Sequence, residues 1–277
     1  MVGAGMAVDG SAVGDDGSQR RVLITGAEGT IGTALREYLG GRYALSALTR
    51  EEQDFPSHVA DISDLDAILP AFTGVEAVVH LAASPAVQTP WPSILQDNII
   101  GTYNVFEAAH RAGVERVVFA SSNHVIGMYE FDGAPDIYAL DDPRTYDHTV
   151  EIRPDSLYGV SKAYGEALGR YYVERHGMKV FCLRIGSVRG NDDPLDPEML
   201  ASSPALLDLT TKEERRVRMR ATWQSRRDIA NLVGRCLDVP DVSWAVVYGI
   251  SDNPRQFWDL SHARELLGYE PRDGAPE

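Results

Sequence analysis

Tyr158 and Lys162 stand four positions apart in the segment YGVSK and are the residues of this sequence best suited to acid–base chemistry. The surrounding residues 157–176 predict a long helix that Gly177 closes, and residues four apart lie on one face of a helix. Free tyrosine has a pKa of about 10 and is a poor base at neutral pH, but a nearby ammonium favours its anion. The pair therefore predicts a general base with an electrostatic partner. A surface Tyr and Lys at chance spacing is the weaker explanation, because the chain has only three lysines.

A second polar group, formed by Ser122, Asn123 and His124, follows the apolar segment RVVFA at residues 116–120. This segment predicts a strand, and residues just beyond the carboxyl ends of parallel strands face the ligand crevice. The Ser122 hydroxyl is suited to hydrogen-bond a reacting oxygen, while Asn123 and His124 are suited to hold substrate hydroxyls. A structural loop histidine is the alternative for His124.

Gly26, Gly29 and Gly32 form the pattern G-x-x-G-x-x-G between a predicted strand at 20–25 and a predicted helix at 33–39. Gly26 permits a sharp turn, Gly29 lets the backbone approach a pyrophosphate, and Gly32 lets helix and strand pack closely. The helix N-terminus adds free N–H groups and partial positive charge for the anion. A plain turn between strand and helix is a much weaker explanation in this context. We expect a dinucleotide to contact Gly26, Glu28, Gly29, Thr30, Ile31 and Gly32.

The residue that ends the second strand normally selects the cofactor, because a carboxylate there binds the ribose 2′-hydroxyl and repels a 2′-phosphate. That strand is predicted at 43–48 and is followed by Thr49 and Arg50, with no carboxylate before Glu51. Thr49 and Arg50 are suited to a 2′-phosphate, so the sequence favours NADP over NAD, with a solvated loop cation as the alternative for Arg50. Further contacts are expected with the adenine from Asp61 and Ile62, and with the nicotinamide-side ribose from Leu81, Ala82 and Ala83.

The elements that must position these groups alternate between short apolar strands and helices. Such alternation implies right-handed crossovers and a parallel sheet, and therefore an α/β fold of the doubly wound Rossmann type with a small C-terminal lobe. Strands are predicted at 20–25, 43–48, 77–81, 116–120, 179–185 and 245–248, and helices at 33–39, 65–72, 94–112, 157–176, 228–238 and 260–267.

The chain divides into three predicted parts. We expect residues 1–19 to be a disordered tail, because they lack the basic and apolar regions of a signal peptide. Residues 20–189 are expected to form the dinucleotide-binding domain that carries the Ser, Tyr and Lys side chains. Residues 190–277 are expected to form a small substrate-binding lobe interleaved with the sheet. Its first part, 190–220, is a predicted polar insertion with a short basic helix.

Acidic residues dominate the charge of the 277-residue chain, since 41 Asp and Glu against 26 Lys and Arg give a net charge of −15. This balance argues against nucleic-acid binding, and no apolar run reaches the roughly 20 residues of a membrane helix. Cys182 and Cys236 cannot form a disulfide framework, and no Cys/His cluster has metal spacing, so we expect a reducing cytoplasm and no metal. Acidic excess with few lysines resembles proteins of salt-accumulating microbes. A GC-rich genome that replaces Lys by Arg is the alternative.

Five segments in this order and spacing, TGAEGTIG, HLAAS, FASSNHVIG, YGVSK and LRIGSV, resemble the extended short-chain dehydrogenase/reductase superfamily. SSNH followed by IGMYE, with LYGVSKAYGE and VYGISDN, resembles a narrower branch. That branch holds uronate dehydrogenases and the sugar or sugar-phosphate dehydrogenases of halophilic archaea. The resemblance spans about Val22 to Tyr269.

The resemblance implies that Tyr158 is the general base, Lys162 its electrostatic partner and a ribose ligand, and Ser122 the hydroxyl that positions the substrate oxygen. In the uronate enzymes an arginine shortly before T-W binds the sugar carboxylate. Arg218 of VRMRATW occupies that position, with a solvated helix face as the alternative. The sequence departs from that family by extra residues within 190–216 and by lacking the strand-end Asp expected for NAD. Further cofactor contacts are expected at Asn98 and Ile185, and substrate contacts at Ser84 and Ser187.

Together these features predict NAD(P)-dependent oxidation of a sugar at the anomeric carbon, with a sugar lactone as product. Neutral pentose, hexose, uronate and sugar phosphate all remain open as substrates, and we expect a homo-oligomer. One alternative is a nucleotide-sugar epimerase or dehydratase, for which the segment after the LRIG strand is short. Another is a non-catalytic dinucleotide-sensing protein, against which the intact Tyr158, Lys162 and Ser122 argue.

Overall fold

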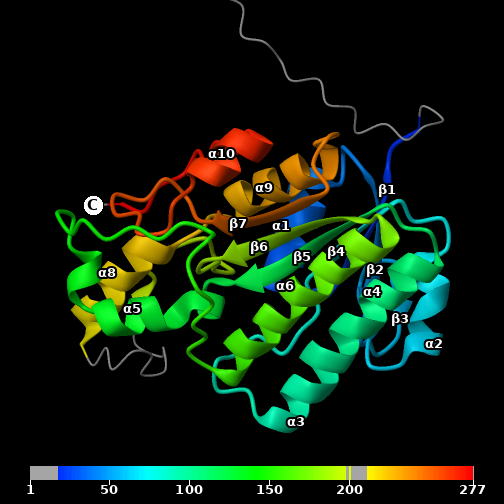
Figure 1. Ribbon diagram of the computed structural model, residues 1–277. Coiled ribbons are helices and arrows are strands. Elements are labelled where there is room, and N and C mark those ends of the chain that lie inside the picture. The colour runs from blue at the N-terminus through cyan, green and yellow to red at the C-terminus, as the bar shows by residue number, and fades with distance from the viewer. Residues whose placement is uncertain (1–17, 198–199, 201–210, 277) are drawn as a thin grey trace, which may run out of the picture.

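Seven parallel strands form one sheet in the order β3-β2-β1-β4-β5-β6-β7 (Figure 1). This computed structural model describes residues 18–197, 200 and 211–276. The strand order changes direction between β1 and β4, which is the switch point where ligands bind in doubly wound folds. The strands are β1 Arg21–Thr25, β2 Ala44–Thr49, β3 His58–Val59, β4 Ala77–His80, β5 Arg116–Ser122, β6 Lys179–Ile185 and β7 Trp244–Gly249.

Helices cover both faces of this sheet (Figure 1). On one face, α1 Thr30–Leu39 and α9 Arg226–Asp238 bury apolar side chains against the strands. On the other face, α4 Gly101–Arg111 and α6 Leu157–His176 do the same. Both faces of each central strand are therefore buried, and the predicted doubly wound parallel α/β fold is confirmed. The remaining described α-helices are α2 Leu65–Ile68, α3 Trp91–Ser93, α5 Gly127–Gly133, α8 Lys212–Thr222 and α10 Ser261–Leu267.

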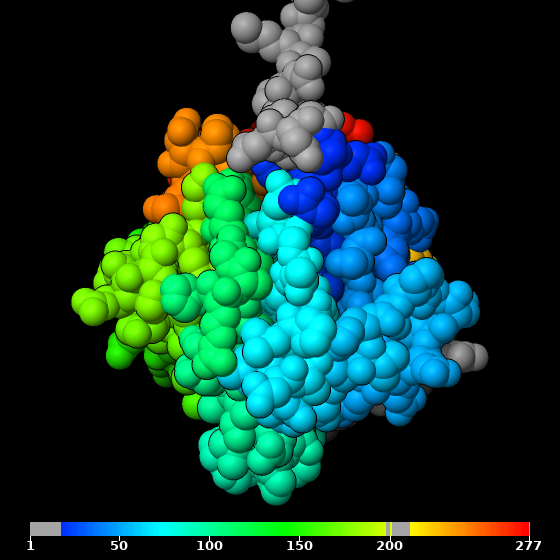
Figure 2. Space-filling view, turned by 90° about the vertical axis from the view of Figure 1, so that its right-hand side faces the viewer, coloured from blue at the N-terminus to red at the C-terminus, as the bar shows by residue number. Residues whose placement is uncertain are grey.

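The carboxyl ends of β5, β6 and β7 point toward the side of the molecule where α5 and α8 lie (Figure 1). Figure 2 shows the opposite face, where the segments that lead into β5, β4, β1 and β2 lie side by side in the order of the sheet. Polar residues that end the strands therefore gather on the side of α5 and α8.

Most predicted elements are present, with small shifts at their ends. The predicted bounds of α6 and β6 are confirmed, whereas β5 runs to Ser122 instead of Ala120. The single helix predicted at 94–112 consists of a π-helix, Ile94–Ile100, followed by α4. The two-residue strand β3 is too short to leave a periodic signal, and the tail predicted at 1–19 lies almost wholly outside the described residues.

The C-terminal third of the chain is tied into the same sheet. It contributes β7 at the edge beside β6. The short basic helix predicted in this region is α8, which begins with a capping box between Thr211 and Glu214. No helix within residues 18–197 or 211–276 is both long and apolar enough to cross a membrane.

The start of α6 is set by Ser156, whose hydroxyl accepts a hydrogen bond from the Gly159 N–H at 3.0 Å. A serine at this position satisfies one of the N–H groups that the first turn leaves unpaired. Tyr158 therefore lies in the first turn of α6, and Lys162 lies one turn further along.

Glu166, one more turn along α6, binds the sheet through a buried ion pair with Arg184 of β6. Arg184 Nη2 lies 2.9 Å from Glu166 Oε2, and Arg184 Nε donates to Glu166 Oε1 at 3.0 Å. Ser121 of β5 donates to the same carboxylate at 2.6 Å. One carboxylate therefore ties α6 to β5 and β6, and Arg184 extends the network to β7 by donating to the Tyr248 hydroxyl at 3.4 Å.

Glu166→Gln should lower the free energy of unfolding by about 3–5 kcal/mol, because it leaves the buried Arg184 guanidinium without its counter-charge. Glu174→Gln is the control, since it removes the exposed partner of Arg170 on the same helix and should cost far less. Urea unfolding of both variants at one salt concentration measures the difference. Equal losses would show that the buried pair does not hold α6 to the sheet.

Candidate active site

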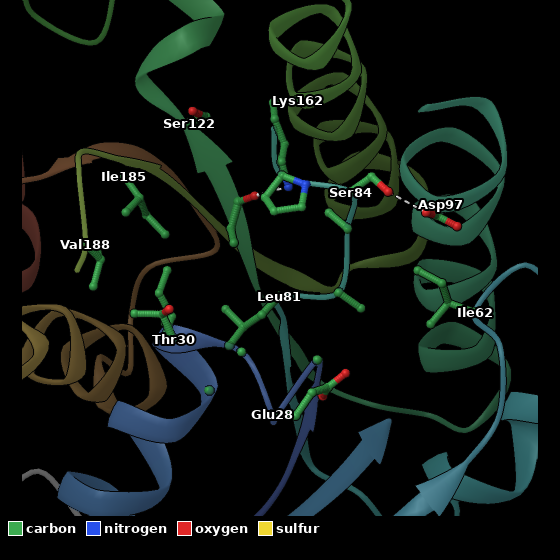
Figure 3. A pocket seen from close by; sticks show the side chains of 18 of the residues that line it. Glu28, Thr30, Ile62, Leu81, Ser84, Asp97, Ser122, Lys162, Ile185 and Val188 are labelled. Atoms are coloured by element: carbon green, nitrogen blue, oxygen red, sulfur yellow. Dashed lines mark hydrogen bonds between the residues drawn. The ribbon is translucent and has the colours of Figure 1, made fainter. Parts of the chain in front are cut away.

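A cavity of about 780 Å³ opens at the carboxyl ends of the strands (Figure 3). Its walls are the glycine-rich loop before α1, the ends of β2, β4 and β5, the first turns of α6 and the segment after β6. In Figure 3, Ser122 and Lys162 lie on one side of Leu81, and Glu28 lies on the other. The predicted site residues that line this cavity are Gly26, Glu28, Gly29, Thr30, Ile31, Gly32, Thr49, Arg50, Ile62, Leu81, Ala82, Ala83, Ser84, Ser122, Asn123, His124, Tyr158, Lys162, Ile185 and Ser187.

The glycine-rich loop has the shape and the charge to hold a diphosphate. Gly26 has a φ of +69°, and a Cβ there would lie 2.9 Å from Ala82, while a Cβ on Gly32 would lie 2.6 Å from the Ala27 backbone. Gly29 precedes α1, whose first turn has no side-chain cap and no acidic residue. The first N–H groups of α1 therefore remain available to an anion, and the positive end of the helix dipole is not compensated. This cradle fits the diphosphate of a dinucleotide.

Tyr158 and Lys162 are both buried against the end of β5. Lys162 Nζ donates to the Ala120 carbonyl at 2.7 Å and lies 5.5 Å from the centre of the Tyr158 ring. Burial lowers the pKa of Lys162 to about 7, because the charged form loses hydration. Burial raises the pKa of Tyr158 to about 12, against a hydrogen bond from Ser122 that lowers it, and the charge of Asp155 raises it further. The Tyr158 hydroxyl thus lies beside Ser122, and more positive charge is needed before the phenol can ionise at neutral pH.

His124 is held in orientation beside this pair. Its Nδ1 lies 2.6 Å from Asp155 Oδ2, and its ring stands edge-on to Tyr158 with centroids 5.8 Å apart. The backbone N–H of His124 donates to Ser122 Oγ at 3.2 Å. Ser156, the N-cap of α6, donates to the other oxygen of Asp155 at 2.8 Å. The cap of α6 and the His124 ring are therefore coupled through one carboxylate.

Arg50 lines the cavity after β2 and is paired with two carboxylates. Its Nη2 lies 2.7 Å from Asp97 Oδ1, and its Nε lies 3.4 Å from Asp61 Oδ2. Burial lowers the pKa of Arg50, but the hydrogen bond and charge of Asp97 outweigh it and raise that pKa above its usual range. Ser84 donates to the other oxygen of Asp97 at 2.6 Å (Figure 3). Asp61 is outside the cavity lining and faces Arg50, and the Thr49 hydroxyl donates within its own loop.

Arg218 and Asn98 also lie outside the cavity lining. Arg218 is bound by Glu130 of α5, with Nε 2.8 Å from Oε1 and Nη2 3.2 Å from Oε2. Glu130 is buried, the Arg218 side chain is only 11% exposed, and Tyr138 donates to the same carboxylate at 2.8 Å. The positive charge expected to face the substrate is therefore matched inside the protein. The Asn98 amide donates to Ser161 of α6 at 3.0 Å and so connects the π-helix to α6.

Three charged residues of the lining, Glu51, Asp97 and Arg189, were not expected from the sequence. Asp97 lies in the π-helix, whose wider turn changes which residues share a face, so helical periodicity does not single it out. Arg189 follows β6, and its place beyond the carboxyl end of a strand was the available signal. No group of three or more His, Cys, Asp and Glu in the described ranges could hold a metal ion.

The chain is similar to proteins of one family. The model of the NAD dependent epimerase/dehydratase family matches residues 22–230. The NAD-dependent glucose-6-phosphate dehydrogenase of Haloferax volcanii is 39% identical over 267 residues, with 92% of this chain and 94% of that protein covered. The L-arabinose 1-dehydrogenase (NAD(P)(+)) of the same organism is 38% identical, with 92% of this chain and 97% of that protein covered. A mutant of the uronate dehydrogenase from Agrobacterium tumefaciens, solved in complex with NAD, is 33% identical with a TM-score of 0.74, covering 92% of this chain and 86% of that one.

Gly32→Ala should weaken dinucleotide binding by about 10-fold or more, because the new Cβ would lie 2.6 Å from the Ala27 backbone and push α1 away from the loop. Gly41→Ala is the matched control, since a Cβ there meets nothing within 4 Å. Calorimetric titration with NAD and with NADP, together with the melting temperature of each variant, separates lost binding from lost folding. Unchanged affinity in a folded Gly32→Ala protein would contradict the diphosphate cradle.

Proposed function

The chain belongs to the NAD dependent epimerase/dehydratase family, and from this premise we propose that it is a sugar dehydrogenase that uses NAD(P) to oxidise the anomeric carbon to a lactone. One observation carries the proposal: Tyr158, Lys162 and Ser122 meet in the wall of a cavity that also contains the diphosphate cradle. The names of the relatives support a sugar as substrate, and one of them names position 1 as the site of oxidation.

In this proposal the dinucleotide lies across the carboxyl ends of β1 and β4, with its diphosphate at the N-terminus of α1. We propose that residues 20–189, which supply the described lining of the cavity, hold the dinucleotide, and that residues 190–277 form a small substrate-binding lobe beside it. When bound, the oxidised dinucleotide supplies the acceptor for the hydride that leaves the sugar.

Tyr158 takes the proton of the anomeric hydroxyl in the proposed reaction. The C1–H bond breaks, its two electrons leave with the hydride, and the C–O bond becomes the lactone carbonyl. With its pKa raised to about 12 the phenol is protonated at pH 7, so positive charge must stabilise the phenolate. Lys162, whose Nζ lies 5.5 Å from the centre of the Tyr158 ring, supplies part of this charge when it is protonated, and a bound oxidised dinucleotide would supply the rest. Ser122 hydrogen-bonds the reacting oxygen and keeps it beside the phenol.

We propose that the enzyme accepts both NAD and NADP, with Arg50 as the residue that contacts the 2′-phosphate of NADP. No carboxylate ends β2 to exclude that phosphate, and Arg50 lines the cavity there. Asp97 and Asp61 already neutralise the guanidinium, however, which weakens its attraction for a further anion. This balance makes the preference for NADP smaller than the sequence alone suggests.

We also propose that the protein works as a homo-oligomer. Large apolar side chains are exposed on neighbouring helices, Tyr103 on α4 and Leu157, Val160 and Tyr171 on α6. Grouped exposed apolar side chains favour a protein–protein contact over solvent.

Tyr158→Phe should lower kcat for sugar oxidation by about 100- to 10,000-fold, because the variant cannot accept the hydroxyl proton. Dinucleotide affinity should change little. Tyr171→Phe is the control, since that ring is half exposed on the same helix. Absorbance of the reduced dinucleotide measures turnover across a panel of sugars, and residual activity above about a tenth of wild type would remove Tyr158 from the role of base.

Arg50→Ala should raise KM for NADP by about 10-fold and leave KM for NAD within about twofold, because only NADP offers a 2′-phosphate to the guanidinium. Arg111→Ala, which removes an exposed arginine paired with Glu107 on α4, is the control. Steady-state kinetics with each dinucleotide at saturating sugar give the two constants. A wild-type enzyme that uses NAD alone would show that the end of β2 is misinterpreted.

A further inference from the structure

Arg189 is a half-buried cation in the cavity lining that the proposed reaction does not yet use. Its Nη2 donates to Met219 Sδ of α8 at 3.0 Å, and a thioether is a weak acceptor. Burial lowers the pKa of Arg189, and so does the charge of the nearby Arg218, while Asp196 offsets part of this. Within residues 18–197 and 211–276 no carboxylate forms an ion pair with Arg189.

Three other arginines in and around the cavity each have a carboxylate partner. Arg50 is paired with Asp97, and Arg218 is bound through two nitrogens by the buried Glu130. Arg184 is paired with Glu166 beneath the active site. Among the described residues, Arg189 has the Met219 sulfur and a more distant carboxylate, Asp196, as its partners, although a guanidinium removed from water without a counter-charge is costly. A cation without a counter-charge in the wall of a cavity is typical of a ligand-binding position.

The contact with Met219 places the Arg189 guanidinium on the α8 side of the cavity, beyond Ser187 and Val188. Ile185 and Val188 lie together on the wall next to Thr30 in Figure 3, and Ser122 lies further along that wall. If the C1 of a sugar lies at Ser122 and Tyr158, the segment from Ile185 to Arg189 forms the adjacent wall of its binding site.

We propose that Arg189 binds an anionic group, a phosphate monoester or a carboxylate, on the part of the sugar remote from C1. The proposal rests on the proposed sugar oxidation and adds the substrate class: an acidic sugar in preference to a neutral aldose. Arg218 does not serve this purpose, because Glu130 already matches its charge. A guanidinium presents paired N–H donors that fit either anion, and such charge-assisted hydrogen bonds are roughly twice as strong as neutral ones.

The negative net charge of the protein means that an acidic sugar needs a local cation in order to bind. At −15, the chain repels anions at long range. Glu28 and Glu51 also line the cavity. Two cations of the lining, Lys162 and Arg189, have no ion-pair partner in the part of the chain that the structure describes. Lys162 is bound to the Ala120 carbonyl beside Tyr158, so Arg189 is the one suited to an anionic group remote from C1.

Arg189→Gln tests the proposal with glucose 6-phosphate, glucuronate and glucose as probes. KM should rise by about 10- to 100-fold for whichever acidic sugar the wild type oxidises, while kcat/KM for glucose and KM for the dinucleotide stay within about twofold. Loss with the phosphate alone identifies a phosphate monoester as the source of the anion, and loss with the uronate alone identifies a carboxylate. Arg216→Gln is the matched control, because Arg216 is an exposed arginine of α8 paired with Glu213.

Binding measured without turnover separates this proposal from the proposed reaction. Calorimetric titration of the Tyr158→Phe protein, saturated with NAD or NADP, should show the same acidic sugar binding at least about 10-fold more weakly when Arg189→Gln is added. If no sugar is oxidised by the wild type but this difference persists, sugar oxidation fails and the anion site stands. If neither acidic sugar binds, if glucose is affected equally, or if dinucleotide affinity falls instead, the anion site is overturned. Loss on Arg218→Gln and not on Arg189→Gln would overturn it as well.

Discussion

Glu166 and Arg184 form an ion pair in which both side chains are almost fully buried, at the point where α6 crosses β5 and β6. The pair has geometric consequences because Glu166 is on the same helix as Tyr158 and Lys162, while Ser121, which donates to it, is next to Ser122. A buried carboxylate that must satisfy a guanidinium and a hydroxyl tolerates little movement. The distance between the phenol and the serine hydroxyl is thus set from below the cavity. The sugar is not needed to set it.

The same rule of charge matching divides the cavity into regions of different chemistry. The glycine-rich loop offers an uncapped helix end, which is suited to the diphosphate. Arg50 and Arg218 carry charges that neighbouring carboxylates already match, and these ion pairs join the loop after β2 to the π-helix and α8 to α5. Burial lowers the pKa of Lys162, and burial together with the charge of Asp155 raises the pKa of Tyr158. Without ligand the Tyr158 hydroxyl is therefore protonated, and the positively charged ring of an oxidised dinucleotide is the change that would favour its anion.

The parts of this structure that could be predicted from the sequence are those that depend on residues close together in the chain. The strand–loop–helix unit around Gly29 and the long helix that carries Tyr158 have strong local patterns, and α6 and β6 have the predicted bounds. The position of Arg218 could not be predicted in this way, because its partner Glu130 is 88 positions away and lies on another helix. Arg50 and Asp97 are likewise 47 positions apart, and the π-helix hides the face on which Asp97 lies. Spacing identifies which residues are able to do chemistry, whereas three-dimensional pairing decides which charges remain free.

The position of β7 in the sheet has a consequence for how the protein is made. This strand lies at the edge of the sheet and comes last along the chain, so β6 has an unpaired edge until β7 has been synthesised. Arg184 then also lacks its register partner Tyr248. The buried carboxylate of Asp228 accepts hydrogen bonds from the backbone of residues 272–273, which extends this dependence almost to the end of the described chain. The packing partner of α1, α9, also comes late in the chain, so both the dinucleotide cradle and the wall that carries Tyr158 are completed only toward the end of translation.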